Sequence, residues 1–323
     1  MQTVLITGGA GFIGSHVARR RRGAGRRVRV LDNFDPFYAE TIKRRNVELT
    51  RAVSAASYDL VEGDFRDATV CRSALEGVDA VLHLGALAGV RPSIEQPIRY
   101  MDVNVTGTQT LLAATAERST TMPVVFASSS SVYGGNTKVP FAETDPVDHP
   151  VSPYAASKKA GEVVCSTHHH LYGNPITCLR FFTVYGPGQR PEMAIHKFAR
   201  LLVAGEPIPM FGDGSTRRDY TFIDDIVDGV VTALDRASGY RIYNIGGSRT
   251  TELGTLIATM EEVFGKKAVI ARQPEQPGDV RQTWADTSLL ERDLGFVPRV
   301  DIREGLTRFA AWYLEERAAG RLS

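Results

Sequence analysis

Short apolar runs alternate with helix-period segments through the first half of the chain. A short apolar run bounded by turn residues is typical of a strand that is buried on both faces of a parallel sheet. Strands that alternate with helices in this way build a doubly wound parallel sheet, so the pattern predicts an α/β fold. The predicted strands are Thr3–Thr7, Arg29–Leu31, Asp59–Glu62, Ala80–Leu84, Pro123–Ala127 and Thr177–Arg180.

The regular alternation ends near residue 180. Beyond it, the sequence predicts a helix over Met193–Ala204 and a short strand over Pro207–Phe211. We therefore expect a first domain over residues 1–180 and a smaller C-terminal α/β domain over residues 181–323, with some C-terminal segments returning to the first domain.

Composition argues against several classes of partner. The 323 residues carry a formal net charge of +1, which gives no reason to expect a nucleic acid or a charged membrane surface as partner. No apolar run approaches the length of about 18 residues that a membrane-spanning helix needs, and the N-terminus has no signal-peptide pattern. We therefore expect a soluble, cytoplasmic protein that binds neither nucleic acid nor membrane.

Three groups of residues have a plain structural interpretation. Cys71, Cys165 and Cys178 are an odd number of cysteines at no metal-ligand spacing, so we expect reduced and buried thiols. Consecutive residues of a helix point to different faces, so the run His168–His170 predicts no metal site. Because the whole chain is nearly neutral, the run Arg19–Arg22 favours a solvated helix end over a polyanion site.

The first predicted strand runs directly into three spaced glycines. Gly8, Gly11 and Gly14 lie between that strand and a helical segment, which is the context of a dinucleotide fingerprint. Gly8 permits the tight turn, Gly11 lets a pyrophosphate approach the backbone, and Gly14 permits close helix–sheet packing. Asp32, about 20 residues further on, can accept hydrogen bonds from ribose hydroxyls and would repel a 2′-phosphate. The pattern therefore predicts a Rossmann-type domain that binds NAD rather than NADP.

Other cofactor-binding candidates follow from their positions. Ligands of a doubly wound sheet bind at the carboxyl ends of its strands, where helix starts offer amide groups to phosphates. Asp64 and Phe65 lie at such an end and could hold adenine. For Asn104, a hydrogen bond inside the protein is an equally good interpretation. The further candidates are Phe12, Ile13, Asn33, Asp64, Phe65, Leu84, Ala86 and Asn104.

Tyr154 and Lys158 are the most informative pair for chemistry. Ser152 and Pro153 predict the start of a helix in which the two side chains share a face. A free tyrosine has a pKa of about 10, so a base at neutral pH needs a pKa lower by about 3, which corresponds to about 4 kcal/mol. Lys158 and the positive charge of an oxidised nicotinamide can each supply part of that lowering. The spacing alone fits an ordinary amphipathic helix, but downstream of a dinucleotide fingerprint it predicts a catalytic base.

Four serines, Ser128–Ser131, follow one predicted strand directly. They could simply form a turn. Upstream of the Tyr154 helix, however, at least one of them is better interpreted as a hydroxyl donor to a reacting oxygen.

Taken together, these residues resemble the extended short-chain dehydrogenase/reductases over nearly the whole chain. The resembling segments are Thr7–Gly14, Asp32-Asn33, Gly63-Asp64, Ser128–Gly134, Tyr154–Lys158 and Arg180–Gly186. The resemblance implies a second domain that binds a nucleotide-activated sugar, and a catalytic trio of Ser129, Tyr154 and Lys158. Ser129 is chosen among the serines for its separation of 25 residues from Tyr154, as in the sugar epimerases.

Within that superfamily the chain is most similar to the UDP-glucuronate 4-epimerases. The similar segments are Ala88–Ser93, Arg180–Pro187 and Gln276–Val280. Pro92 departs from the residues more usual in those enzymes, and UDP-glucose 4-epimerases usually carry asparagine where Thr183 stands. Nucleotide-sugar dehydratases and glucuronate decarboxylases typically carry an acid where Ser131 stands, and its loss removes the group expected for chemistry at C5 or C6.

The resemblance also implies which residues bind a UDP-sugar. Arg218 would hold the diphosphate and Phe211 would pack on uracil, although taken alone they would be surface charge and core. Gln276 and Asp279 would lie near the ribose. Arg190 is the most natural ion-pair donor to the carboxylate of a hexuronate. The full set of carboxylate candidates is Arg190, Arg91, Thr183, Ser130 and Ser131.

We therefore expect an enzyme with tightly bound NAD that converts UDP-glucuronate to UDP-galacturonate through a transient 4-keto sugar. Ionised Tyr154 would take the proton of the C4 hydroxyl, Ser129 would bond the same oxygen, and Lys158 would bond the nicotinamide ribose. The nearest rival is a UDP-glucose/UDP-galactose 4-epimerase. A UDP-glucuronate decarboxylase and a non-catalytic NAD-sensing protein are weaker rivals, the latter because the whole trio is present. The family expectation is also a homodimer through the Met101–Arg118 and Tyr154–Tyr172 helices.

Overall fold

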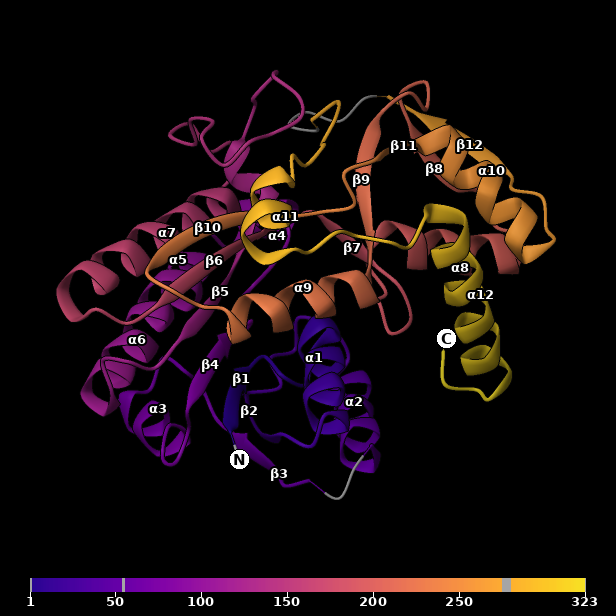
Figure 1. Ribbon diagram of the computed structural model, residues 1–323. Helices are drawn as coiled ribbons and strands as arrows, with labels where there is room; N and C mark the ends of the chain where they lie inside the picture. Colours follow the sequence, from indigo (N-terminus) through magenta and orange to yellow (C-terminus); the bar gives the residue numbers. More distant parts are fainter. Residues whose placement is uncertain (1, 54–55, 275–279, 323) are drawn as a thin grey trace.

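A seven-stranded parallel sheet forms the centre of the molecule (Figure 1). The computed structural model describes residues 2–53, 56–274 and 280–322 of the chain. The strand order is β10-β6-β5-β4-β1-β2-β3. From β1 the chain builds the sheet outward first through β2 and β3 and then, on the other side of β1, through β4, β5 and β6. The strands are β1 (Thr3–Thr7), β2 (Arg27–Asp32), β3 (Tyr58–Glu62), β4 (Ala80–His83), β5 (Val124–Ser129), β6 (Ile176–Phe181) and β10 (Tyr240–Ile245). The expected doubly wound α/β fold is confirmed, and its ligand crevice belongs where the order reverses.

Side chains of the central sheet alternate between two hydrophobic cores. Val4 and Ile6 belong to one core and Leu5 to the other, and all three are fully buried. A strand that is apolar on both faces must be covered on both faces, which explains the short unbroken apolar runs. Helices α1 (Phe12–Gly23) and α9 (Ile223–Asp235) cover one face, with α2 (Glu40–Ala52) beside α1. The other face carries α3 (Ala68–Ala74), α6 (Gly107–Arg118) and α7 (Pro153–Tyr172).

Helix α7 begins where its sequence signals predict. The Ser152 hydroxyl accepts a hydrogen bond from the Ala155 N–H at 3.1 Å, and Pro153 occupies the first helical position. The helix ends at Gly173, whose φ of 81° is the left-handed conformation that favours glycine. These caps fix the position of Tyr154 in the first turn.

A π-helical turn interrupts the helix that was expected over Met101–Arg118. Helix α5 (Pro97–Met101) leads into the turn η1 (Asp102–Thr106), which leads into α6. The widened turn directs the Asn104 amide to the backbone of Leu87, donating to its carbonyl at 2.9 Å and accepting from its N–H at 2.8 Å. Such turns are frequent at functional sites. Here the turn anchors the segment that follows β4, which leads into α4 (Val90–Glu95).

Two small sheets and two helices form a separate group that we call the small lobe. The predicted helix over Met193–Ala204 and strand over Pro207–Phe211 are both present, each beginning one residue later than expected. The small lobe consists of β7 (Thr183–Tyr185), β8 (Ile208–Phe211), β9 (Arg217–Phe222), β11 (Thr250–Glu252), β12 (Ile270–Gln273), α8 (Ala194–Ala204) and α10 (Leu253–Phe264).

Of the last two helices, α11 (Ser288–Leu294) lies against the large sheet and α12 (Ile302–Ala318) against the small lobe. Helix α11 packs on β10, and α12 packs on α10. Between β9 and β11 the chain also leaves the small lobe, because β10 pairs with β6 in the large sheet. Within the described residues, no helix is long and apolar enough to cross a membrane.

The arginine run on α1 is a solvated helix end only in part: Arg20 is exposed, but the expectation was wrong for Arg21 and Arg22. Arg21 and Arg22 are each 3% exposed. Arg21 donates to Asp235 on α9 at 2.7 Å, and Arg22 donates to the carbonyl of Thr50 on α2 at 2.6 Å. Because α1 lies between α2 and α9, successive arginines reach acceptors on both neighbouring helices.

Cysteine and histidine side chains have structural surroundings. Cys71, Cys165 and Cys178 are buried, as expected. His168 is buried and its Nε2 lies 3.1 Å from the Asn174 side-chain oxygen, whereas His170 is exposed. No group of three or more His, Cys, Asp or Glu side chains placed to hold a metal occurs in the described part of the chain.

Candidate active site

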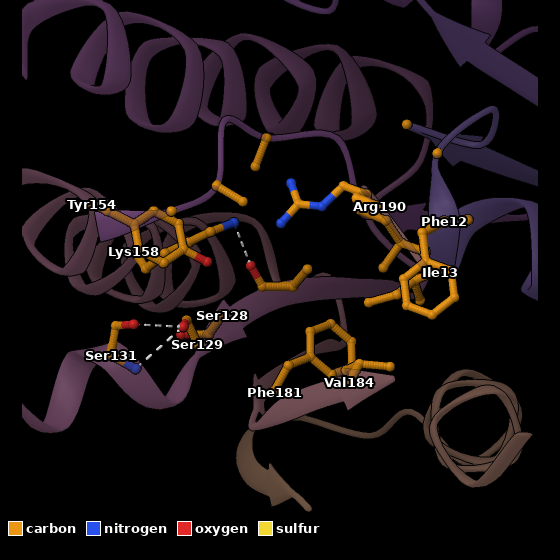
Figure 2. A pocket seen from close by; sticks show the side chains of 18 of the residues that line it. Phe12, Ile13, Ser128, Ser129, Ser131, Tyr154, Lys158, Phe181, Val184 and Arg190 are labelled. Carbon is orange, nitrogen blue, oxygen red and sulfur yellow. Dashed lines mark hydrogen bonds between the residues drawn. The ribbon is translucent and has the colours of Figure 1, made fainter. Parts of the chain in front are cut away.

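One cavity lies along the carboxyl ends of the central strands and gathers most of the candidate residues (Figure 2). Its walls are the β1–α1 turn, the ends of β4 and β5, helix α7, and the chain from the end of β6 to Met193. This is the place where doubly wound sheets bind their ligands. The predicted site residues that line it are Gly8, Gly11, Phe12, Ile13, Gly14, Asp32, Leu84, Ala86, Ser129, Ser130, Ser131, Tyr154, Lys158, Thr183 and Arg190.

In the glycine turn, Gly8 and Gly14 pack against the protein backbone, whereas Gly11 leaves room for a ligand. A Cβ atom on Gly14 would lie 2.3 Å from the Gly8 carbonyl oxygen, and one on Gly8 would lie 2.7 Å from the Gly85 Cα. Around Gly11 only two atoms come within 4 Å of such a Cβ. Helix α1 begins there with no side-chain cap, so its first N–H groups remain available. This arrangement fits the diphosphate of a dinucleotide.

Asp32 ends β2 at the edge of the cavity. Its carboxylate accepts hydrogen bonds from the N–H groups of Ala10 at 3.0 Å and Phe34 at 2.9 Å. Burial raises the pKa of this carboxyl, and the two N–H groups oppose that effect. A carboxylate has about four lone-pair sites, so Asp32 can still accept hydrogen bonds from ribose hydroxyls. The residues present therefore fit an adenosine diphosphate moiety without a 2′-phosphate.

Tyr154, Lys158 and Ser129 meet in the cavity, as Figure 2 shows. Tyr154 and Lys158 lie one turn apart on α7, and Ser129 ends β5. The Ser129 hydroxyl donates to the Ser131 hydroxyl at 3.2 Å, and it is close enough to the Tyr154 phenol to lower its pKa. The Lys158 ammonium donates to the Ala127 carbonyl at 2.7 Å. A phenol, a hydroxyl and a cation in this arrangement can exchange a proton with a substrate hydroxyl.

The groups of the protein raise the pKa of Tyr154 instead of lowering it. Burial is the largest cause, whereas the nearby Ser129 hydroxyl and the charge of Arg190 lower the pKa. Burial also lowers the pKa of Lys158, to about 8. The expected lowering of the Tyr154 pKa by Lys158 stays a prediction, because in these surroundings burial outweighs the charge of Arg190. A base at neutral pH would need a further positive charge beside the phenol, such as that of an oxidised nicotinamide.

A buried ion pair that sequence reasoning missed lies beneath the serine strand. Glu162, one turn beyond Lys158 on α7, accepts hydrogen bonds from Arg180 on β6 at 2.8 and 3.0 Å. The Ser128 hydroxyl donates to the same carboxylate at 2.6 Å, so it is not free for a substrate. The signal was present, because residues four apart share a helix face. This pair fixes the ends of β5 and β6 against the helix that carries Tyr154.

Asn33 and Asp64 do not line the cavity, contrary to expectation. The Asn33 amide donates to the Asp64 carboxylate at 3.0 Å, and Arg66 donates to it at 2.7 Å. Arg66 also lowers the pKa of Asp64, although burial opposes it. The side chains expected to hold the adenosine are therefore bonded to each other and to an arginine two residues away.

Phe65 and Asn104 serve the interior of the protein. The Phe65 ring is buried edge-on against His83, with ring centroids 5.1 Å apart. Asn104 bonds Leu87, as described above, and donates to the Ser157 hydroxyl at 2.9 Å. For Asn104 the structure matches the internal hydrogen bond that was considered equally good from the sequence. Neither side chain lines the cavity.

The predicted substrate residues separate into two groups. Thr183 and Arg190 line the cavity, and Figure 2 shows the Arg190 guanidinium between the Tyr154–Lys158 pair and Phe12. The Arg190 side chain is 20% exposed, and its Nε lies 3.2 Å from the Glu192 carboxylate. One cation is thus held in the cavity near the phenol.

Three further predicted substrate residues, Arg91, Phe211 and Arg218, do not line this cavity. The Arg91 guanidinium lies 5.7 Å from the centroid of the Phe211 ring, so the structure joins these two side chains across the boundary of the small lobe. Arg218 on β9 donates to the carbonyl of Arg217 at 2.9 Å. Gln276 and Asp279 lie outside the described residues.

Several residues that were not predicted also line the cavity. Tyr38 enters it from the loop between β2 and α2, and Phe181, Val184 and Met193 enter it from the chain around β7. Apolar residues of this kind carry no sequence signal that separates them from core. Tyr38 follows Asp32 by six residues in an aperiodic loop, so no pattern placed its side chain.

Comparisons with known proteins agree with the geometry. Residues 4–246 match the model of the NAD dependent epimerase/dehydratase family. UDP-glucuronate 4-epimerase 3 of Arabidopsis thaliana is 42% identical over 334 residues, covering 97% of this chain and 76% of the relative. A crystal structure of UDP-glucuronic acid 4-epimerase from Bacillus cereus with UDP-glucuronic acid and NAD has a TM-score of 0.90 at 33% identity, covering 97% of this chain and 99% of that one. UDP-glucose 4-epimerase of Thermotoga maritima with UDP-glucose has a TM-score of 0.89 at 30% identity, covering 98% and 100%.

Proposed function

Because the chain belongs to the NAD dependent epimerase/dehydratase family, with NAD as its cofactor, we propose that it is a UDP-hexuronate 4-epimerase. The proposed reaction converts UDP-glucuronate to UDP-galacturonate. One observation carries this proposal: Arg190 and Thr183 share a cavity with Tyr154 and Ser129. A cation and a hydroxyl beside the acid–base group suit a sugar that carries a carboxylate next to the reacting carbon.

The chain supplies acid–base chemistry and orientation. NAD, when bound, would supply a reversible hydride acceptor for C4 of the sugar, and Lys158 would hold its nicotinamide ribose. Ionised Tyr154 takes the proton from the C4 hydroxyl, and Ser129 bonds the same oxygen. After the 4-keto sugar has turned about its diphosphate linkage, Tyr154 gives the proton back.

The site must bind the carboxylate of the sugar without promoting its release as carbon dioxide. The 4-keto form of a hexuronate is a β-keto acid, which is prone to release carbon dioxide. Arg190, Thr183 and Ser130 are placed to bind the carboxylate, and Ser131 stands where dehydratases and decarboxylases typically carry an acid. Among the described residues that line the cavity, the one carboxylate is Asp32, which is bonded to the glycine turn. These contacts favour epimerisation over decarboxylation.

Proton NMR of the products formed from UDP-glucuronate tests this proposal. We expect the spectrum of UDP-galacturonate, with inversion at C4. UDP-pentose and released carbon dioxide as main products would show instead that the site is a decarboxylase. A much higher kcat/KM on UDP-glucose than on UDP-glucuronate would favour the neutral-sugar epimerase, and the likeness to the Thermotoga maritima enzyme makes that comparison necessary.

We propose that two copies of the chain associate through α7 and the Met101–Arg118 stretch, extended at its start by α5. Ile98 and Met101 on α5 are 82% and 39% exposed, and Val163 on α7 is 52% exposed. Exposed apolar side chains gathered on neighbouring helices mark a surface for a protein partner. Sedimentation velocity should give the mass of a dimer, and a monomer at micromolar concentration would contradict this assembly.

A further inference from the structure

The Tyr38 hydroxyl is a buried polar group without an acceptor. Its hydrogen meets no acceptor among the described residues, although its oxygen is shielded from solvent. A buried hydroxyl left unpaired costs about 1–3 kcal/mol. Burial also raises the pKa of the phenol, so it stays protonated and is a donor in need of an acceptor.

The oxygen of Tyr38 lies over the glycine turn. A Cβ atom on Gly11 would lie 3.6 Å from it, and Tyr38 lines the same cavity as Gly11. The N–H of Phe12, at the start of α1, is close enough to lower the pKa of the phenol. The hydroxyl thus stands beside the uncapped start of α1, where a helix binds anions.

Contacts from three directions hold the Tyr38 loop in place. The Lys43 ammonium lies 4.6 Å from the centroid of the Tyr38 ring and donates to the Asp35 carbonyl at 2.5 Å. Arg99 donates to the Asp35 carboxylate at 2.6 Å. The Arg190 guanidinium lies 5.5 Å from the centroid of the Phe37 ring. A donor that is fixed in advance binds at low entropic cost, and the nearby cations favour an anionic acceptor.

We propose that the Tyr38 hydroxyl donates a hydrogen bond to the diphosphate of bound NAD and completes the anion site formed by Gly11 and the start of α1. The acceptor has the required charge, and it occupies the position that the glycine turn leaves open. A hydrogen bond at this point contributes to retention of a cofactor that is recycled within one catalytic cycle. This inference concerns the cofactor alone and stands whether the sugar is charged or neutral.

The variant Tyr38→Phe removes the hydroxyl and keeps the ring. Calorimetry on the full chain freed of nucleotide should show roughly 10- to 100-fold weaker binding of NAD and of ADP, as for loss of a hydrogen bond to a charged group. Binding of adenosine, which has no phosphate, should change by less than about 2-fold, since no hydrogen bond to it is lost. The amount of NAD that copurifies with the variant should fall as well.

Tyr58→Phe is the matched control, because the Tyr58 hydroxyl is also buried without a partner and Tyr58 does not line the cavity. It should leave NAD and ADP binding unchanged. The nucleotide-free Tyr38→Phe protein should unfold at the same temperature as wild type or higher, since an unpaired hydroxyl has been removed. Unchanged ADP binding, or equal weakening of ADP and adenosine, would overturn the assignment.

Discussion

The cofactor side of the cavity and its substrate side are built in different ways. On the cofactor side, main chain meets main chain: a Cβ atom on Gly8 would lie 2.7 Å from Gly85, and one on Gly14 would lie 2.3 Å from Gly8. On the substrate side, long side chains reach in from separate segments, as Arg190 does from the chain beyond β7. Main-chain contact tolerates almost no substitution, whereas side chains can be exchanged. The same fold can therefore keep its cofactor while its sugar changes.

The large sheet and the small lobe also hold their ion pairs differently. The Glu162–Arg180 pair of the large sheet has side chains 1% and 2% exposed. The Arg217–Glu252 pair of the small lobe has side chains 45% and 39% exposed. Burial decides how much each pair matters, because water screens the second and not the first.

Breaking the buried pair should have the largest effect. Arg180→Met leaves the Glu162 charge uncompensated in the interior, which should lower the free energy of unfolding by about 3–5 kcal/mol. The matched change in the small lobe, Arg217→Met, should lower it by less than about 1 kcal/mol. Urea unfolding of both variants measures the two free energies of unfolding. Equal losses in the two variants would show that the contrast in burial does not govern stability.

Removing the Tyr154 hydroxyl should have the next largest effect. Tyr154→Phe should reduce kcat by at least about 100-fold, as for loss of a general base, with NAD content unchanged. Tyr172→Phe, at the exposed end of the same helix, should keep wild-type turnover. Epimerisation by the Tyr154 variant at a near wild-type rate would remove Tyr154 from the chemistry.

Removing the cation on the substrate side should alter which sugar is used. Arg190→Met should lower kcat/KM on UDP-glucuronate by roughly 10- to 100-fold, the value of a hydrogen bond between charged groups, and on UDP-glucose by less than about 3-fold. Arg200→Met, which removes an exposed arginine of α8, should change neither. A parallel fall on both sugars would place Arg190 at the phosphates or the cofactor.

The smallest expected effect is on how stability depends on pH, which should differ between helix α1 of the large sheet and strand β9 of the small lobe. Burial lowers the pKa of His16 on α1 from 6.5 to about 4, and it raises the pKa of Asp219 on β9 from 3.8 to about 6. The stability that His16 contributes is present above pH 6.5 and is lost as the pH falls toward 4. The stability that Asp219 contributes is present below pH 3.8 and is lost as the pH rises through 6.

Two substitutions test these opposite dependences of stability on pH. Between pH 4 and 6, His16→Gln should make the slope of unfolding free energy against pH more negative, and Asp219→Asn should make it more positive. Each change should be at most about 1.4 kcal/mol per pH unit. Chemical unfolding at several pH values measures both, and changes of the same sign in the two variants would contradict the assignment.

Features set by main-chain geometry were predictable from the sequence. Gly8 and Gly14 are required by close contacts, and Ser152 with Pro153 starts α7 at the expected residue. Six strands of the central sheet were predicted to within two residues at each end, whereas β10 was not predicted. The strand β1, predicted with both ends correct, is apolar and buried along its length.

Features set by side-chain partners were not predictable. The Asp64 carboxylate accepts a hydrogen bond from Arg66. The spacing of Asp64 and Arg66 in the sequence does not show that Asp64 would bond this arginine and not a ligand. Burial raises the pKa of Tyr154, and Arg190, 36 residues away in the sequence, is a cation that lowers it, which no local spacing could show. Tyr38 lies in a loop with no period, so its position depends on tertiary contacts alone.

Strand β10 limits how the molecule can be cut and recombined. It follows the small-lobe strand β9 in the chain but pairs with β6 at the border of the large sheet. Truncation after residue 181 would leave the backbone groups of β6 unpaired, and a bare strand of that kind promotes aggregation. A chimera that borrows its sugar specificity from a relative must therefore transplant internal stretches and keep the native Tyr240–Ile245, since a simple swap of C-terminal halves would carry the sheet border away with the graft.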